Sequence, residues 1–154
     1  MRQDLRELYQ AVILDHAQRP RNFRSSDNAD VTAHGDNPMC GDHVTVFLRM
    51  EEGIIADVCF VGQGCALSLA SASLMTELLR GRTPQKARRL CGEFEDMCDE
   101  GQPLGSPVAE EDAAALERLQ VFSGVRAFPV RIRCAILPWQ AIREALAGEP
   151  HDRD

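Results

Sequence analysis

Two neighbouring runs of alternating apolar residues constrain the fold more than any other feature of the chain. Between Val44 and Met50 the apolar side chains fall mainly on every second position, and after the turn residues 51–53 a second strand-like run extends from Ile54 to Val61. A period of two residues is typical of a half-buried strand, and a short turn containing glycine joins antiparallel neighbours. The sequence therefore predicts a β-hairpin, to which residues 31–35 could add a third, edge strand.

Helical patterns precede and follow this hairpin. At the N-terminus, apolar residues recur at helical spacing after Asp4 and Glu7, which resemble a capping box, and the helix is expected to end before Pro20. Later helices are expected at residues 65–80, from Pro84 after the cap Thr83, at 109–119 after the cap Ser106, and at 136–147. Pro138 is tolerable there only in the first turn or at a kink. This order indicates an α+β domain with a small three-stranded antiparallel sheet and helices packed on one side.

Composition narrows the class of protein. With 154 residues and 44% hydrophobic residues, the chain fits a single domain, 1–154, whose core needs no disulfides. A formal net charge of -7 argues against nucleic acid or an anionic membrane as partner. We expect a cytoplasmic protein, because neither a secretory signal nor an apolar run of ~20 residues is evident.

Four residues form a candidate metal site: Cys40, Asp42, Cys65 and Cys134. Three thiolates and one carboxylate suit zinc, although no Cys-x-x-Cys spacing supports the assignment. Cys65 follows a Gly-Gln-Gly segment and is expected at a helix N-terminus, where the helix dipole favours a thiolate. Cys134 is expected just before the last helix.

Other residues compete for a place in this site or surround it. His43 could replace Asp42 as a ligand, but neighbouring strand residues face opposite sides of a sheet, so we rank Asp42 first. Arg131 and Arg133 flank Cys134 and could stabilise an anionic sulfur, although a solvated surface role is the simpler reading of Arg133. We expect Cys59, and the pair Cys91 and Cys98, to have structural roles. We expect His16 and His34 to be surface or structural histidines.

Three motifs, in this order, resemble the IscU/NifU-N family of iron–sulfur cluster assembly proteins: Asn-Pro-Met-Cys-Gly-Asp at residues 37–42, Gly-Gln-Gly-Cys-Ala-Leu-Ser-Leu-Ala-Ser-Ala-Ser at 62–73, and Gly-Val-Arg-Ala-Phe-Pro-Val-Arg-Ile-Arg-Cys-Ala at 124–135. The resemblance extends over nearly the whole chain, from about residue 8 to residue 147.

Two departures place the chain nearer the SufU branch of that family. Arg133 stands where the IscU scaffolds carry histidine, and residues 127–131 read Ala-Phe-Pro-Val-Arg instead of Leu-Pro-Pro-Val-Lys. The chain also resembles SufU in a longer segment between the second and third cysteines, located at about 100–124, and we expect residues from about 148 to 154 to be frayed.

The resemblance implies a zinc-dependent sulfurtransferase with zinc held by Cys40, Asp42, Cys65 and Cys134. A SufS-type cysteine desulfurase would supply persulfide sulfur to Cys40 after a desulfurase histidine displaces that thiolate from zinc, and a downstream Suf-type cluster scaffold would receive the sulfur. Arg131 would support the reaction electrostatically. Two alternatives remain open: a scaffold that assembles a [2Fe–2S] cluster on the same cysteines, and a non-catalytic protein with a structural zinc site.

Overall fold

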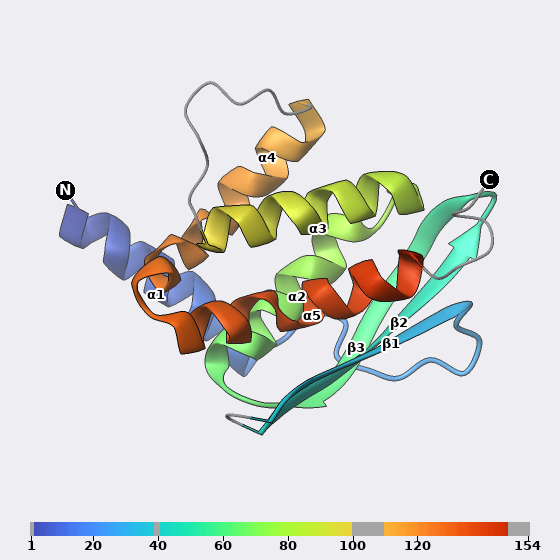
Figure 1. The fold of residues 1–154 in the computed structure, drawn as a ribbon, viewed down its shortest axis with the longest axis horizontal. Helices are drawn as coiled ribbons and strands as arrows, with labels where there is room; N and C mark the ends of the chain where they lie inside the picture. The colour runs from blue at the N-terminus through green and yellow to red at the C-terminus, as the bar shows by residue number, and fades with distance from the viewer. Residues whose placement is uncertain (1, 39–40, 100–109, 148–154) are drawn as a thin grey trace.

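In the described part of the chain, one helix precedes a small sheet and the other helices follow it (Figure 1). The computed structural model describes residues 2–38, 41–99 and 110–147. The elements are α1 (Arg2–Gln18), β1 (Val31–Asn37), β2 (Asp42–Glu51), β3 (Ile54–Gln63), α2 (Ala66–Leu79), α3 (Pro84–Asp99), α4 (Glu110–Arg118), the 3₁₀ segment η1 (Leu119–Ala127) and α5 (Pro129–Ala147). None of the helices within these ranges has both the length and the apolarity needed to cross a membrane.

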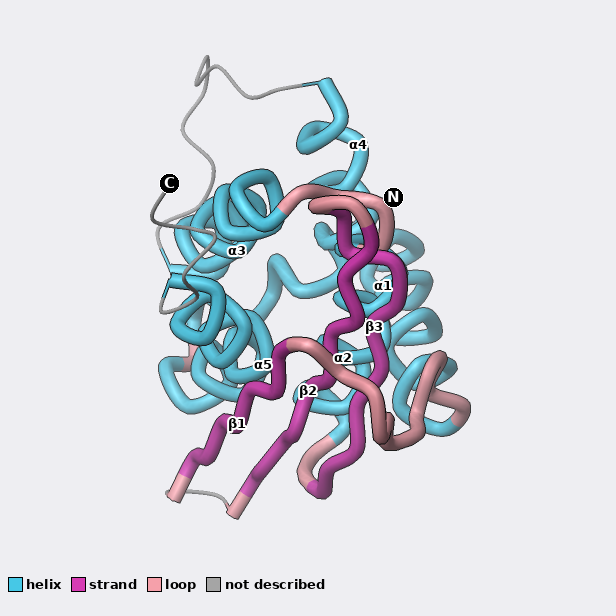
Figure 2. The backbone as a smooth tube through the Cα atoms, turned by 90° about the vertical axis from the view of Figure 1, so that its right-hand side faces the viewer, coloured by secondary structure: helices cyan, strands magenta, loops and turns pink. Residues whose placement is uncertain are grey.

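The sheet is antiparallel in the order β1-β2-β3, as the alternating pattern predicts. Val46 in the central strand β2 pairs with Ala33 on one side and Phe60 on the other, and all three side chains are buried. The helices cover one face of the sheet, with α5 packed on β1 and β2 and α2 packed on β3 (Figure 2). The α+β class with helices on one side is therefore confirmed.

An aromatic cluster fixes α5 against the other helices. The Phe94 ring on α3 lies 4.8 Å from the Trp139 ring on α5 and 5.7 Å from the Phe122 ring of η1, measured between centroids. All three side chains are fully buried. Burying a large aromatic side chain stabilises a fold by a few kcal/mol, on the order of 25 cal/mol per Å² of apolar surface. This cluster therefore sets where the residues of α5 lie relative to α2 and the sheet.

The buried His16 connects α1 to α2. Its Nδ1 atom lies 2.7 Å from Ser73 Oγ, which also accepts a hydrogen bond from the backbone N–H of Arg21 over 2.8 Å. Burial lowers the pKa of His16, which favours the neutral ring in this position. The expected structural role of His16 agrees with these contacts.

The last helix begins earlier than the sequence predicts. Helix α5 begins at Pro129, so Cys134 lies inside the helix, and the prediction that it precedes the helix is wrong. Proline at the first helical position is favourable, because its fixed φ angle suits a helix and its missing N–H is not needed there. Pro138 accordingly lies in the interior of α5 and outside its first turn.

The other helix boundaries are closer to the predictions. Helix α1 already includes Asp4, so the predicted capping box does not mark its start, whereas its end at Gln18 is as expected. Thr83 caps α3 by accepting a 3.3 Å hydrogen bond from the N–H of Lys86. The expected cap Ser106 lies outside the described residues. The 3₁₀ segment η1 was not expected, because a short irregular helix has no strong periodicity.

Candidate metal centre

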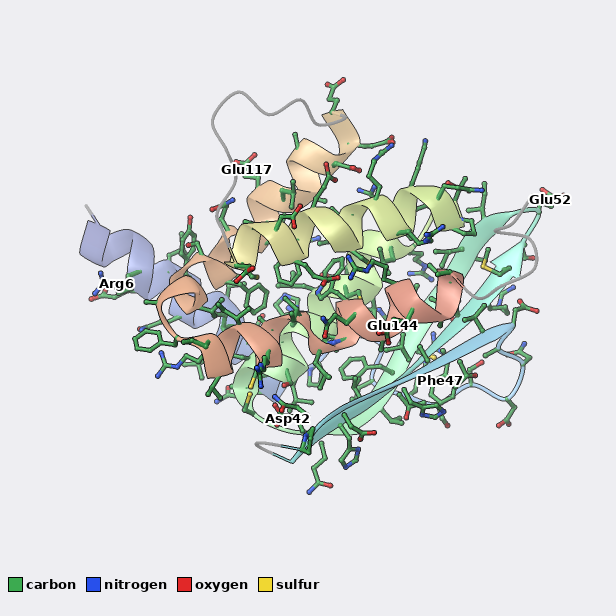
Figure 3. The ribbon with its side chains drawn as sticks, in the orientation of Figure 1. Arg6, Asp42, Phe47, Glu52, Glu117 and Glu144 are labelled. Atoms are coloured by element: carbon green, nitrogen blue, oxygen red, sulfur yellow. The ribbon has the colours of Figure 1, made fainter. Side chains whose placement is uncertain are left out.

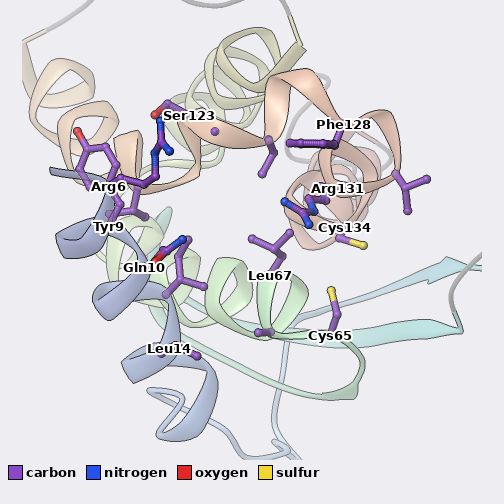
Figure 4. A pocket seen from close by; sticks show the side chains of 16 residues that line it. Arg6, Tyr9, Gln10, Leu14, Cys65, Leu67, Ser123, Phe128, Arg131 and Cys134 are labelled. Carbon is purple, nitrogen blue, oxygen red and sulfur yellow. The ribbon is translucent and has the colours of Figure 1, made fainter. Parts of the chain in front are cut away.

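Three of the four predicted ligands lie together, although they come from distant parts of the chain. Asp42 is the first residue of β2, Cys65 is the N-cap of α2, and Cys134 lies in α5. One carboxylate oxygen and the two Sγ atoms all lie within 4.8 Å of one another. Figure 3 marks Asp42 below the start of α5, and Figure 4 shows the two thiols pointing toward each other. The fourth predicted ligand, Cys40, lies outside the described residues.

The Asp42 carboxylate is held at the N-terminus of α2. Its Oδ1 atom accepts a hydrogen bond from the backbone N–H of Cys65 over 3.0 Å, and its Oδ2 atom lies 3.6 Å from Cys65 Sγ. A carboxylate is favourable there, because the first N–H groups of a helix have no partner within the helix and the helix dipole is positive at this end. These contacts explain how Asp42 is accommodated although only 3% of it is exposed.

Gly64 permits this close approach. A Cβ atom at position 64 would lie 2.6 Å from Asp42 Oδ1 and 2.9 Å from its Cγ, well inside van der Waals contact. Gly41, before Asp42, has a φ of +75°, which residues with a side chain rarely adopt. Gly41 and Gly64 therefore each have a defined steric reason.

The donor set fits a zinc ion. In a tetrahedral zinc site the usual bond lengths place a sulfur and an oxygen ligand about 3.5 Å apart, close to the 3.6 Å between Cys65 Sγ and Asp42 Oδ2. Cys134 is buried, whereas Cys65 is exposed, so the centre is open to the surface on one side. His43 is exposed and Asp42 is buried, which is the orientation expected for neighbouring strand residues.

A largely apolar groove of about 1260 Å³ leads to the two thiols. Its walls come from α1, α2, η1 and α5, and Cys65, Cys134 and Arg131 line it (Figure 4). The Arg131 guanidinium lies over the Phe128 ring, 4.5 Å from the ring centroid, a distance at which a cation and an aromatic face attract. The groove therefore brings a positive charge and two thiols to one surface.

Arg133 faces a different part of the surface. It lines a separate cavity of about 600 Å³ together with the acidic residues Glu95, Asp96 and Asp99. On a helix, residues 131 and 134 share a face, whereas residue 133 points to the other side. Of the two arginines that the sequence places near Cys134, only Arg131 lines the groove of the thiols.

Three further cysteines lie away from the candidate centre. Cys59 on β3 and Cys91 and Cys98 on α3 are all buried, in agreement with the expected structural roles. Burial raises the pKa of the Cys59 and Cys91 thiols, which disfavours the reactive thiolate.

Sequence analysis missed two residues of this region. Ser68 donates a hydrogen bond to Asp42 Oδ2 over 2.7 Å, and Phe128 supports Arg131. The sequence spacing could have identified Ser68, because it lies three residues after Cys65 and residues at this spacing share one face of a helix. Phe128 had no comparable signal, because its contact depends on how η1 joins α5.

Comparisons with known proteins identify the family of this chain. Residues 8–135 match the family model of the NifU-like N-terminal domain. The zinc-dependent sulfurtransferase SufU of Bacillus subtilis is 34% identical over 146 residues, which cover 95% of this chain and 94% of that protein. The iron–sulfur cluster assembly scaffold protein IscU of Streptococcus pyogenes is 35% identical, with 92% and 84% of the two chains covered.

The fold of this chain is also similar to that of a solved structure. The crystal structure of the SUF-system protein FiSufU from Fervidobacterium islandicum superposes with a TM-score of 0.76 at 32% identity, and the match covers 88% of this chain and 93% of that one. The chain therefore belongs to the family of NifU-like N-terminal domains, which includes the IscU and SufU proteins of iron–sulfur cluster assembly.

Proposed function

We propose that this protein is a zinc-dependent sulfur carrier in iron–sulfur cluster assembly, with zinc bound by Cys40, Asp42, Cys65 and Cys134. The observation that carries the proposal is the convergence of the Asp42, Cys65 and Cys134 donor atoms within 4.8 Å. The similarity to a protein named zinc-dependent sulfurtransferase supports the choice of metal. Bound zinc would keep the thiols of the site deprotonated near neutral pH.

The proposed reaction is a thiolate exchange at Cys40. The Cys40 thiolate attacks the terminal sulfur of a persulfide on the donor enzyme, a new sulfur–sulfur bond forms at Cys40, and the donor cysteine leaves as a thiolate. No oxidant is needed, because one sulfur–sulfur bond replaces another. The Arg131 guanidinium lines the groove beside Cys65 and Cys134, and its positive charge would favour the anionic sulfur species.

We propose a cysteine desulfurase of the SufS type as donor, a Suf-type cluster scaffold as the downstream acceptor, and the cytoplasm as the compartment. The open side of the centre, where Cys65 is exposed, gives a partner protein access to the site. The acidic surface, with a net charge of -7, disfavours nucleic acid as a partner.

Metal content of protein purified anaerobically tests the zinc assignment. The carrier model predicts about one zinc per chain and no visible charge-transfer bands. Iron and sulfide with visible absorption would instead support a [2Fe–2S] scaffold, the second candidate, which the similarity to proteins named IscU scaffold favours.

Cys40→Ala tests the acceptor role. Incubation with desulfurase and L-cysteine, followed by mass spectrometry, should give a persulfide at Cys40 in the wild-type chain and lose it in the variant. Cys59→Ala is the control, because Cys59 is buried in the sheet and should leave the persulfide in place. A persulfide at another cysteine of the wild-type chain would refute the assignment of Cys40.

Chelation distinguishes a carrier from a protein whose zinc is only structural. The buried core is extensive and includes the cluster of Phe94, Phe122 and Trp139, so metal removal should abolish sulfur acceptance while circular dichroism retains the helical signal. Unfolding on chelation would instead support a structural zinc site.

A further inference from the structure

The Ser68 hydroxyl contacts all three described residues of the candidate metal centre. Ser68 lies in the first turn of α2 and is 6% exposed. Its Oγ atom lies 2.7 Å from Asp42 Oδ2, 3.3 Å from the carbonyl oxygen of Cys134, and 3.6 Å from Cys65 Sγ. One small side chain therefore connects β2, α2 and α5 at the point where their ligands meet.

The hydroxyl proton determines which of these contacts is strongest. A serine hydroxyl has one hydrogen to donate, and the Asp42 carboxylate is both charged and closer than the Cys134 carbonyl. Donation to Oδ2 complements the Cys65 N–H, which binds Oδ1. Because both carboxylate oxygens are then held, the carboxylate cannot rotate away from Cys65 Sγ without losing a hydrogen bond.

The Ser68 hydroxyl also lies near the backbone of Cys134, whose carbonyl is four residues before Pro138 in α5. In a regular helix this carbonyl would accept the N–H of residue 138, but proline has no N–H. The Ser68 hydroxyl approaches the same carbonyl from α2, across the interface between the two helices. Because the Ser68 proton is directed to Asp42, this approach brings α2 and α5 into contact without a second hydrogen bond.

Ser71, one turn further along α2, has a related but separate position. Its hydroxyl donates to the carbonyl of Ala135 and accepts the Trp139 indole N–H over 2.9 Å. Ser71 is fully buried and, like Ser68, connects α2 to α5 near Pro138. Its hydrogen bonds involve α5 and the core, whereas those of Ser68 reach the Asp42 carboxylate.

We infer that Ser68 is a positioning residue of the metal centre, which orients the Asp42 carboxylate. The inference rests on the proposed function, because it assumes that Asp42 and the cysteines bind zinc. If Cys40 leaves the metal to accept sulfur, only three protein ligands remain, and Ser68 connects those three. Hydrogen-bond partners of metal ligands commonly change metal affinity by 10–100-fold when they are removed.

Ser68→Ala and the matched control Ser71→Ala test this role. Zinc affinity is measured by competition with a chromophoric chelator, and folding by thermal melting. Both variants lose a buried hydrogen bond and should melt at lower temperature than the wild-type chain. Only Ser68→Ala should weaken zinc binding, by 10–100-fold. Equal zinc affinity in Ser68→Ala and the wild-type chain would overturn the inference.

A double-variant cycle separates positioning from general stability. If Ser68 acts through the carboxylate, adding Ser68→Ala to Asp42→Asn should change zinc affinity much less than Ser68→Ala does alone. Equal effects in both backgrounds would contradict the positioning role. If Ser68→Ala fails to fold, Ser68→Thr and Ser68→Val test the positioning role instead. The threonine and valine side chains have the same shape, but only threonine keeps the hydroxyl. Ser68→Thr should therefore retain zinc affinity, and Ser68→Val should lose it.

The same measurements separate this inference from the proposed function. A wild-type chain that takes up no zinc would overturn the zinc site and the inference together. Tight zinc binding that is indifferent to Ser68 would overturn the positioning role alone.

Discussion

The backbone N–H of Cys65 donates a hydrogen bond to Oδ1 of Asp42 over 3.0 Å, which joins the start of α2 to the start of β2. The contact brings together two residues that are 23 positions apart in the sequence. It also gives a hydrogen-bond partner both to an N–H group at the helix N-terminus and to a buried carboxylate. The candidate metal centre is therefore built into the packing of the fold.

Gly64→Ala should disrupt this contact. The new Cβ would lie 2.6 Å from Asp42 Oδ1, so the carboxylate must move away from its present position beside Cys65. We expect zinc affinity to fall about 10–100-fold, as it does when a ligand's orientation is disturbed, while the helical circular dichroism signal is retained. Gly124→Ala is the control, because a Cβ there meets no atom within 4 Å. Unchanged zinc affinity in Gly64→Ala would contradict the steric argument.

Arg131→Gln should slow sulfur transfer without loss of zinc. Arg131 lines the groove that contains Cys65 and Cys134, so its charge favours an anionic sulfur species there. We expect a rate about tenfold lower, equivalent to ~1.4 kcal/mol, in a persulfide-transfer assay with the desulfurase. Arg133→Gln is the matched control, since Arg133 lines the other cavity. Similar rates for the two variants would argue against a specific role for Arg131.

Asp112→Ala should destabilise the fold strongly. The Asp112 side chain is fully buried and makes ion pairs of 2.7 Å with Arg82 and 2.6 Å with Arg89, which connect α4 to α3 and to the turn before it. Removing the carboxylate loses charge-assisted hydrogen bonds and should cost about 1–3 kcal/mol in the free energy of unfolding, because Arg82 is mostly buried whereas Arg89 is partly exposed and regains water. Urea denaturation measures this loss. Glu77→Ala, which breaks the more exposed pair with Arg118, should cost about 0–1 kcal/mol.

The neighbouring Glu93 should make stability depend on pH. Burial and the adjacent Asp112 carboxylate raise the pKa of Glu93 to about 7, above its ordinary value of about 4.3. Between these values the folded chain binds more protons than the unfolded chain, so the free energy of unfolding falls as pH rises from about 4.3 to 7. The pKa of Asp112 is lowered, because hydrogen bonds from Arg89, Glu93 and Arg82 outweigh its burial, and its contribution is lost only in acid.

Glu93→Gln removes the group responsible for that decline. Urea denaturation between pH 5 and pH 7.5 should therefore show a flatter profile for the variant than for the wild-type chain. Glu117→Gln is the control, because Glu117 is exposed on α4 (Figure 3). Identical profiles for Glu93→Gln and the wild-type chain would show that Glu93 is ionised in the folded protein.

Most of the secondary structure could be predicted from local patterns. The hairpin follows from the alternation between Val44 and Val61, and the start of α3 follows from the Thr83 cap. The start of α5 was predicted wrongly, because Pro138 reads as a helix breaker. In the folded chain Pro138 lies inside α5, where Trp139 and its contact with Phe94 on α3 hold the helix in place, and this packing comes from another helix.

The sequence by itself determined the order of the elements, the α+β class and the residue types that can bind a metal, because hydrophobic periodicity and side-chain chemistry are local properties. Only the tertiary structure decided that Asp42, Cys65 and Cys134 meet, that Arg131 and not Arg133 lines their groove, and that Ser68 connects them. The physical reason is that these relationships depend on which faces of α2, α5 and the sheet pack together. That packing is set by the whole buried core, including the contact of Phe94 with Trp139, and not by any single segment.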